Sequence, residues 1–264
     1  LMSVTGERDD RPGGGPQKVG VAVADLFTGM YATVAILAAL RHAERTGEGQ
    51  HIDMALLDTQ VAMLANLGAN YLVRGREEGK VPGRAGNAHV NIVPYQVFEV
   101  APNAHGQPQH IILAIGNDGQ FIKFCEVAGQ PALAADPRFA RNQDRVRHRN
   151  ELVPQLDALL RTRSKAEWLS TLEAAKVPCG PINSLAEVFE DPQVLHRNMV
   201  HRWDNAQAHP LADRIDLVNS PMRLSRTPVR HDHPPPVLGQ HQHEVLAEWL
   251  GTARAAELAH SDAV

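Results

Sequence analysis

The strongest constraint on the fold is a long apolar segment between residues 28 and 46. Its first half, from Thr28 to Leu40, is almost continuously apolar, and its last turn is basic with Arg41, His42 and Arg45. Gly47 follows, and glycine is the residue that most often ends a helix. This pattern predicts one long helix, and its apolar character on every side predicts that the helix is buried on most sides.

Asp25 lies at the junction between this helix and a short apolar stretch, Val19–Ala24. An aspartate just before a helix commonly caps it, because the carboxylate accepts hydrogen bonds from unpaired backbone N–H groups and interacts with the helix dipole. The other interpretation is a working carboxylate. Position alone favours the cap, and only the sequence that follows reverses this preference.

Residues 75–90 are rich in glycine and charge, and they predict a linker between two domains. Before it we expect a short strand at Gln50–Ala55 and a helix at Leu56–Arg74. After it we expect strands at Tyr95–Val100 and His110–Ile115 around a turn at 103–106. The remaining expected elements are helices 118–128, 145–161 and 165–175 (the last with a Ser164/Glu167 capping box), an extended segment 177–183, short helices 185–189 and 192–197, strands within 199–224 separated by 204–209, and a helix 243–250.

Composition excludes several classes of function. The net charge is −4, so no basic field for nucleic acid is expected. The longest apolar run, near Ala32–Leu40, is too short to span a bilayer, so no membrane partner is expected. Cys125 and Cys179 form no motif and suit a reducing, cytoplasmic location. The 14 histidines lack acidic or cysteine partners at ligand spacing, so no metal site is predicted.

Several short motifs then occur in a fixed order along the chain. They are Gly29-Met30-Tyr31-Ala32, Arg45-Thr46-Gly47-Glu48-Gly49-Gln50, Pro94-Tyr95-Gln96, Val177-Pro178-Cys179-Gly180-Pro181, Asp191-Pro192-Gln193-Val194 and Leu238-Gly239-Gln240-His241. In this order and spacing the chain resembles the family III coenzyme A transferases (CaiB/BaiF type), a group that includes formyl-CoA transferase, carnitine CoA-transferase and α-methylacyl-CoA racemase. The resemblance runs from the first residues to the last.

The resemblance implies an α/β fold: part of a Rossmann-like large domain plus a smaller α+β domain. The expected division is 1–74 for the large-domain part with the aspartate, 75–90 for the linker, 91–184 for the small domain, and 185–264 for a return segment that packs on the large domain. The chain opens at a point that resembles the middle of the family's large domain. We therefore expect that the first third of a usual member, with most contacts to the CoA nucleotide, is not in this sequence. Two explanations stay open: the sequence is a fragment of a longer protein, or the gene product itself is truncated.

For the site, the resemblance assigns Asp25 as the nucleophile of an acyl-CoA:carboxylate CoA-transferase that works through an aspartyl anhydride and thioester. Backbone N–H groups near Gly86-Asn87 or Gly116-Asn117 are candidate oxyanion donors, although such pairs are usually plain turns. His89 and Tyr95 are candidates for the acyl pocket. The CoA thioester is a substrate, no covalently bound cofactor or metal is expected, and the family implies an interlocked homodimer.

Two alternatives stay open. The first is a racemase, in which an acid/base pair would act on the α-carbon; the family's racemases place a glutamate where this chain has Asn117, and only the adjacent Asp118 could transfer a proton. The second is a catalytically silent homologue. A nucleophilic role for Cys179 has no supporting histidine pattern, and a small buried thiol is the more common case.

Overall fold

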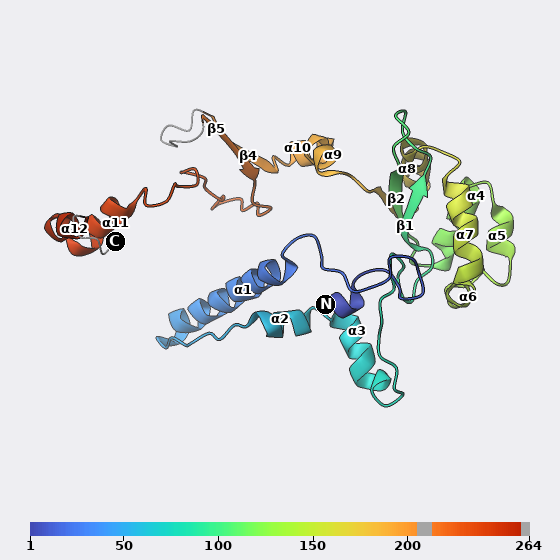
Figure 1. Cartoon of the computed structure of the whole chain (residues 1–264), viewed down its shortest axis with the longest axis horizontal. Coiled ribbons are helices and arrows are strands. Elements are labelled where there is room, and N and C mark those ends of the chain that lie inside the picture. The colour runs from blue at the N-terminus through green and yellow to red at the C-terminus, as the bar shows by residue number, and fades with distance from the viewer. Residues whose placement is uncertain (205–212, 260–264) are drawn as a thin grey trace. The chain divides into compact units, whose positions relative to one another are not determined.

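A computed structural model describes residues 1–204 and 213–259, and its contacts divide the chain into two compact units, 1–182 and 183–264 (Figure 1). The expected segment 204–209 therefore falls mainly outside the described residues. The chain combines helices and short sheets, as the α/β class predicts. The finer division at the 75–90 linker stays a prediction.

The first unit begins with helices and contains no strand before residue 95. A short 3-10 helix, η1 (Met2–Val4), precedes the long helix α1 (Val23–Thr46), and shorter helical pieces follow. These are α2 (Leu56–Ala62), α3 (Ala65–Asn70) and the π-helix η2 (Tyr71–Gly75). Helix α1 ends where predicted, because Gly47 adopts the left-handed conformation at φ 78°.

Three expectations for this region were wrong. Helix α1 begins at Val23 rather than at Thr28, so the apolar stretch before Asp25 already contributes its first turn. Gln50–Ala55 forms no strand, because alternation alone is not enough without a neighbouring strand to pair with. The expected helix 56–74 is interrupted near Ala65, whose φ of 44° is incompatible with a continuous helix.

The environment of α1 also differs from expectation. None of its residues is buried, and its large apolar side chains are exposed. The helix has 24 residues and an 18-residue window of mean hydropathy 1.7, so by length and composition it could cross a membrane, contrary to the estimate from Ala32–Leu40 alone. Core helices of globular proteins pass the same test, so this single helix is weak evidence for a membrane span.

A three-stranded antiparallel sheet organises the rest of the first unit. Its order is β1 (Tyr95–Val100), β2 (Gln109–Ala114) and β3 (Cys179–Pro181), with Tyr95 paired to Ala114 and Ile111 to Pro181. Both expected strands of the hairpin are confirmed. The helices between β2 and β3 are α4 (Asp118–Val127), α5 (Pro131–Ala135), α6 (Asn142–Arg147), α7 (Arg149–Leu160) and α8 (Lys165–Ala174).

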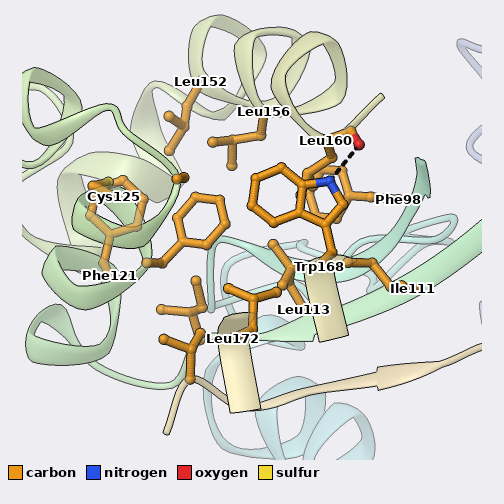
Figure 2. Packing of buried hydrophobic residues seen from close by; sticks show 14 of the residues in the cluster. Phe98, Ile111, Leu113, Phe121, Cys125, Leu152, Leu156, Leu160, Trp168 and Leu172 are labelled. Carbon is orange, nitrogen blue, oxygen red and sulfur yellow. Dashed lines mark hydrogen bonds between the residues drawn. The ribbon is translucent and has the colours of Figure 1, made fainter. Parts of the chain in front are cut away.

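The core of this sheet-and-helix module is shown in Figure 2. Phe98, Ile111 and Leu113 alternate along their strands and point to one face of the sheet, as period-two patterning requires. Helix α7 presents apolar residues four apart to the same core, and Trp168 fills its centre, donating its indole N–H to the Leu160 carbonyl at 2.7 Å. The capping box of α8 is confirmed, with Ser164 and Glu167 bonded in both directions.

The second unit is assembled from short elements. It contains α9 (Leu185–Glu190), α10 (Pro192–His196), an antiparallel pair of β4 (Val200–Asp204) with β5 (Arg214–Val218), and the helices α11 (Gln242–Leu250) and α12 (Thr252–Ala259). Capping boxes or a capping aspartate begin α9 and α10, through Ser184 and Asp191. The expected elements are confirmed here, and α12 is additional.

Candidate functional site

Asp25 is the third residue of α1, in its first turn, and it does not cap the helix. The cap position is Ala22, which has no side chain able to accept a hydrogen bond, so the interpretation of Asp25 as a cap was wrong. The carboxylate is exposed, and within the described part of the chain it has no hydrogen-bond or ion-pair partner. Asp25 is thus an available anion rather than one engaged in structure.

The carboxylate lines a cavity of about 350 Å3 with mainly apolar walls. The walls come from Leu1–Thr5 at one side, from the 17–24 segment at the other, and from Gln60; Lys18 is the cation among them. A backbone hydrogen bond from Gln17 N–H to the Thr5 carbonyl, 2.8 Å, joins the two sides. Apolar walls remove part of the hydration of a carboxylate, and Asp25, which is exposed here, would become a better nucleophile as bound substrate displaces the remaining water.

Three other predicted site residues gather at the entry to β1. The Asn87 side chain bonds the Val97 backbone twice, donating to its carbonyl at 2.6 Å and accepting from its N–H at 3.0 Å. His89 donates its backbone N–H to the Tyr95 carbonyl at 3.0 Å, and the two rings stack with centroids 5.3 Å apart. This pairing gives both aromatic residues a fixed orientation, while the structure places no contact between them and Asp25.

The segment 89–93 is held by one face of α6 and α7. Asn142 bonds the Asn91 carbonyl and the Val93 N–H, Arg145 donates to the Val93 carbonyl at 2.7 Å, and Arg149 donates to the Val90 carbonyl at 2.7 Å. Four backbone groups of an extended segment are thereby satisfied by side chains, which fixes its path. We call Asn142, Arg145 and Arg149 the backbone clamp.

Gly86 lies where the linker passes the N-terminal loop. Its φ is 64°, which favours glycine, and a Cβ at this position would meet the Glu7 carboxylate at 2.4 Å and displace that side chain. This close approach places Gly86 against Glu7 of the charged N-terminal loop.

Gly116 and Asn117 follow the end of β2, at the same end of the hairpin ladder as Tyr95, which pairs with Ala114; next to them the Ile115 N–H is donated to the Pro94 carbonyl at 3.1 Å. The Gly116 N–H is donated to the Gln120 side chain at 2.8 Å, and Asn117 caps α4 by accepting from the Gln120 N–H at 2.9 Å. The Gly116 N–H is therefore engaged in a structural hydrogen bond that an oxyanion role would have to exchange, whereas the Asn117 bond is accepted by its side chain and leaves the role of its N–H untouched. Their role as donors stays a prediction.

Asp118, the residue on which the racemase alternative depends, is also engaged in structure. Its carboxylate accepts from the fully buried Arg145 guanidinium at 2.9 Å and from the Asn142 N–H at 2.8 Å. A carboxylate committed to a buried cation is poorly suited to carry a proton back and forth, because protonation would leave that cation unpaired.

Neither cysteine has the character of a nucleophile. Burial raises the pKa of the Cys125 thiol to about 12, and burial also raises the pKa of Cys179, so the thiolate is disfavoured at both positions. Across residues 1–204 and 213–259 no group of three or more potential ligands is placed to hold a metal ion.

The sequence analysis missed a cluster of arginines. Arg8 and Arg11, on the N-terminal loop, line a second cavity together with Arg149 of α7. Arg149 is far from the other two in the sequence, which hides the cluster; the run Arg-Asp-Asp-Arg at residues 8–11 is the sequence signal that could have drawn attention to the loop.

Comparison with known proteins agrees with the resemblance seen in the motifs. The model of CoA-transferase family III matches residues 1–242. The succinate–glutarate CoA-transferase of Agrobacterium fabrum is 47% identical over 97% of this chain and 60% of that protein. The human succinyl-CoA:glutarate CoA-transferase is 38% identical over 95% of this chain and 53% of that protein.

A solved structure supports the fold independently. The CaiB/BaiF family protein from Brucella suis superposes with a TM-score of 0.71 at 41% identity, over 97% of this chain and 60% of that one. The chain thus spans between half and two thirds of the length of the relatives it matches. With the family model covering nearly all of its length, the chain belongs to CoA-transferase family III.

Proposed function

We propose that the protein containing this chain is an acyl-CoA:carboxylate CoA-transferase in which Asp25 is the acyl-accepting nucleophile. The observation that carries the proposal is the unpartnered Asp25 carboxylate lining an apolar cavity in a member of this family. Solvation normally makes a carboxylate a weak nucleophile, and a mainly apolar wall removes part of that solvation.

The reaction proceeds by exchange at carbonyl carbons. An Asp25 carboxylate oxygen attacks the thioester carbonyl, the C–S bond breaks, and CoA leaves as its thiolate, which gives a mixed anhydride. The thiolate attacks the Asp25 carbonyl carbon, releasing the first acid as a carboxylate and forming an aspartyl-CoA thioester. The acceptor carboxylate then attacks this thioester and releases the thiolate again. Attack of the thiolate on the new acyl group yields the product thioester and free Asp25.

This scheme needs neither a redox step nor a covalently bound cofactor; the CoA thioester is a substrate. Water must be kept from the anhydride, which assigns a protective role to the apolar wall. His89 and Tyr95 are proposed to border the acyl group. In this scheme the Gly86-Asn87 and Gly116-Asn117 backbones supply candidate donors to the developing oxyanion.

For the substrates we propose dicarboxylic acids of four or five carbons. The support is the similarity to two proteins named for succinate and glutarate transfer. A dicarboxylate presents a second anion that needs a cation, and Lys18 is the cation in the wall of the Asp25 cavity. Replacing Lys18 by Gln is expected to raise KM for a dicarboxylate acceptor more than for a monocarboxylate.

The test uses the full protein and two first-turn aspartates. Asp25 and Asp58 are each the third residue of a helix, α1 and α2, so Asp58→Asn is a matched control for Asp25→Asn. With succinyl-CoA, hydroxylamine should trap an adduct on Asp25, detected by peptide mass. Asp25→Asn should lose the adduct and at least roughly 10³-fold in transfer rate, while Asp58→Asn keeps both.

Two results would contradict the proposed transferase activity. Exchange of the α-proton with deuterium, never accompanied by an adduct, would establish the racemase. Absence of turnover together with absence of any CoA-dependent change in Tm would establish a silent homologue.

We also propose that the protein is a homodimer located in the cytoplasm. The exposed apolar side chains of α1 support association, because contiguous apolar surface of this kind is usually covered in a working protein. Light scattering after size exclusion should give twice the chain mass, and a monomer at micromolar concentration would contradict this part.

A further inference from the structure

Gln60 lies in the wall of the Asp25 cavity, although it comes from a different helix. It belongs to the last turn of α2. The chain turns back after α1, and α2 contacts α1 (Figure 1). Thr59, the residue before Gln60, is 3% exposed, so this turn of α2 is packed into the protein. The position of Gln60 is therefore set by helices in contact rather than by a loop.

The Gln60 carboxamide is half-buried, and its hydrogen-bonding groups are unused. Its side chain makes no hydrogen bond to any of residues 1–204 and 213–259. A carboxamide has two N–H donors and an acceptor oxygen, and polar groups that are removed from water normally find partners. Gln60 therefore keeps its donors available for a ligand that enters the cavity.

The other side-chain donors in this wall are less suitable for a reacting atom. The Thr5 hydroxyl is donated to the Leu1 carbonyl at 3.1 Å. Gln17 and Lys18 are exposed on a loop segment, and Lys18 is already proposed to hold the second carboxylate of a dicarboxylic acid. Gln60 combines partial burial, support by a helix and free N–H groups, which are the properties of a preorganised donor.

A donor inside this cavity is needed because the acyl carbonyl becomes an oxyanion there. When an Asp25 carboxylate oxygen bonds to the thioester carbonyl carbon, the electron pair of the carbonyl double bond moves to its oxygen while the C–S bond is still intact. The Gly86-Asn87 and Gly116-Asn117 pairs lie outside the residues that line the cavity. A donor from the wall itself is therefore better placed to meet this charge.

We propose that Gln60 is a catalytic residue whose side-chain N–H donates a hydrogen bond to this oxyanion. The role rests on the proposed acyl transfer by Asp25. Gln60 gives up no proton: the tetrahedral intermediate collapses, the C–S bond breaks, the carbonyl forms again and CoA leaves as its thiolate. A neutral carboxamide suits this role, because it stabilises the oxyanion without forming an ion pair with the Asp25 nucleophile.

Gln60→Ala tests this role with little risk to the fold, since alanine is the best helix former. Gln155→Ala is the control, because Gln155 is exposed on α7 and its side chain donates to the Glu151 carbonyl of the same helix at 2.8 Å. The full protein is mixed with succinyl-CoA. The rate at which the hydroxylamine-sensitive adduct forms on Asp25 is measured by peptide mass, together with kcat and KM.

We expect Gln60→Ala to form the adduct on the order of 10²-fold more slowly than the wild type, because one oxyanion donor typically contributes such a factor. KM for succinyl-CoA should change less than about twofold, since the hydrogen bond is made in the transition state and not with the bound substrate. Gln155→Ala should match the wild type.

Gln60→Glu separates a donor from a merely structural side chain. An ionised glutamate has nearly the same shape but offers no donor and repels the oxyanion, so at neutral pH it should be at least as slow as Gln60→Ala. Its protonated form regains an O–H donor, so the rate of Gln60→Glu relative to the wild type should rise as the pH falls. The relative rate of Gln60→Ala should stay constant over the same range.

Equal adduct rates in the wild type and Gln60→Ala, with Asp25→Asn inactive, would overturn the role of Gln60 and keep the proposed function. A raised KM with an unchanged adduct rate at saturating succinyl-CoA would also overturn it, since Gln60 would then bind the substrate and not the oxyanion. If the wild type forms no adduct, the proposed function fails and the role of Gln60 fails with it.

Discussion

Helix α1 and the sheet-and-helix module from Val93 to Val177 are both rich in apolar residues, and they use them in opposite ways. The module encloses its apolar side chains, and Ile111, Leu113 and Trp168 are all 0% exposed. In α1 no residue is buried, and Met30 and Leu37 are 65% and 61% exposed.

The difference lies in where the covering surface comes from. The module covers its own core: β1 contacts α7, and β2 contacts β3 and α8, so each apolar face meets another within the same module. Helix α1 is apolar on several sides, and its main contact among the described elements is with α2. Apolar content therefore predicts that a surface needs covering, and only the arrangement of neighbours decides whether this chain itself covers it.

The largest expected effect tests whether the module is a true core. Trp168→Ala removes a central side chain and its hydrogen bond to Leu160, so the free energy of unfolding should fall by about 3–5 kcal/mol, measured by urea denaturation. Trp249→Ala is the control, because Trp249 is 78% exposed on α11. Similar losses for both tryptophans would show that the module is not more tightly packed than an exposed surface.

The second prediction concerns the buried cation of the module. Arg145→Met removes the side-chain donor to the Phe139 and Val93 carbonyls and the cation paired with the Asp118 carboxylate, and should cost about 2–4 kcal/mol of unfolding free energy. Arg147→Met, at a neighbouring position that is 68% exposed, should change it by less than about 0.5 kcal/mol. If Arg145→Met instead stabilises the protein, apolar packing outweighs the lost hydrogen bonds.

The third prediction concerns the cap of α8. Ser164→Ala should lower the free energy of unfolding by about 1 kcal/mol, measured by thermal unfolding, whereas Ser170→Ala, in the body of the same helix, should not lower it.

The same cap predicts a dependence on pH. Hydrogen bonds from Ser164 lower the pKa of Glu167 below its ordinary 4.5. A lowered pKa means that the stabilisation is present above the unfolded-state value and is lost as pH falls through the folded-state value. The Tm difference between the wild type and Glu167→Gln should therefore narrow in acid below pH 4.5.

The smallest expected effect on stability concerns helix α1, whose apolar side chains are exposed. Leu37→Ser on α1 should change the unfolding free energy of the isolated chain by less than about 0.5 kcal/mol, because the side chain is already exposed. Light scattering of the same variant should show less self-association. A loss above about 1 kcal/mol would mean that α1 is buried by another surface in solution, and would reverse the contrast between the two regions.

The sequence predicted the module well because its signals are local. Period-two alternation identified β1 and β2, and the Ser164/Glu167 pair located the start of α8 within one residue. Sequence signals failed where the outcome depends on neighbours. Gln50–Ala55 alternates like a strand but has no strand beside it. The helix break near Ala65 depends on a positive φ that the residue types there do not predict.

In the candidate site, too, the residues were predictable from local sequence signals and their contacts were not. Asp25 was identified by its motif, and its first-turn position was missed because the helix begins earlier than the pattern indicated. Asp118 looked like a possible proton carrier until its contact with Arg145 was visible. The arginine-lined cavity joins residues more than 130 positions apart in the sequence, as Arg11 and Arg149 show, and no pattern within one segment encodes such a pairing.

The backbone clamp also determines where the chain can bend. Residues 89–93 are tied to α6 and α7, and residues 84–86 are tied to the N-terminal loop through Arg84 and the Gly86–Glu7 contact. Before these attachments, the Lys80 N–H is donated to the Gly75 carbonyl at 2.7 Å, and within the described residues the stretch 81–83 makes no hydrogen bond or ion pair. Any rotation of the sheet-and-helix module would therefore be concentrated in those few residues. The stacked His89 and Tyr95 rings would move together with the module as part of one rigid body.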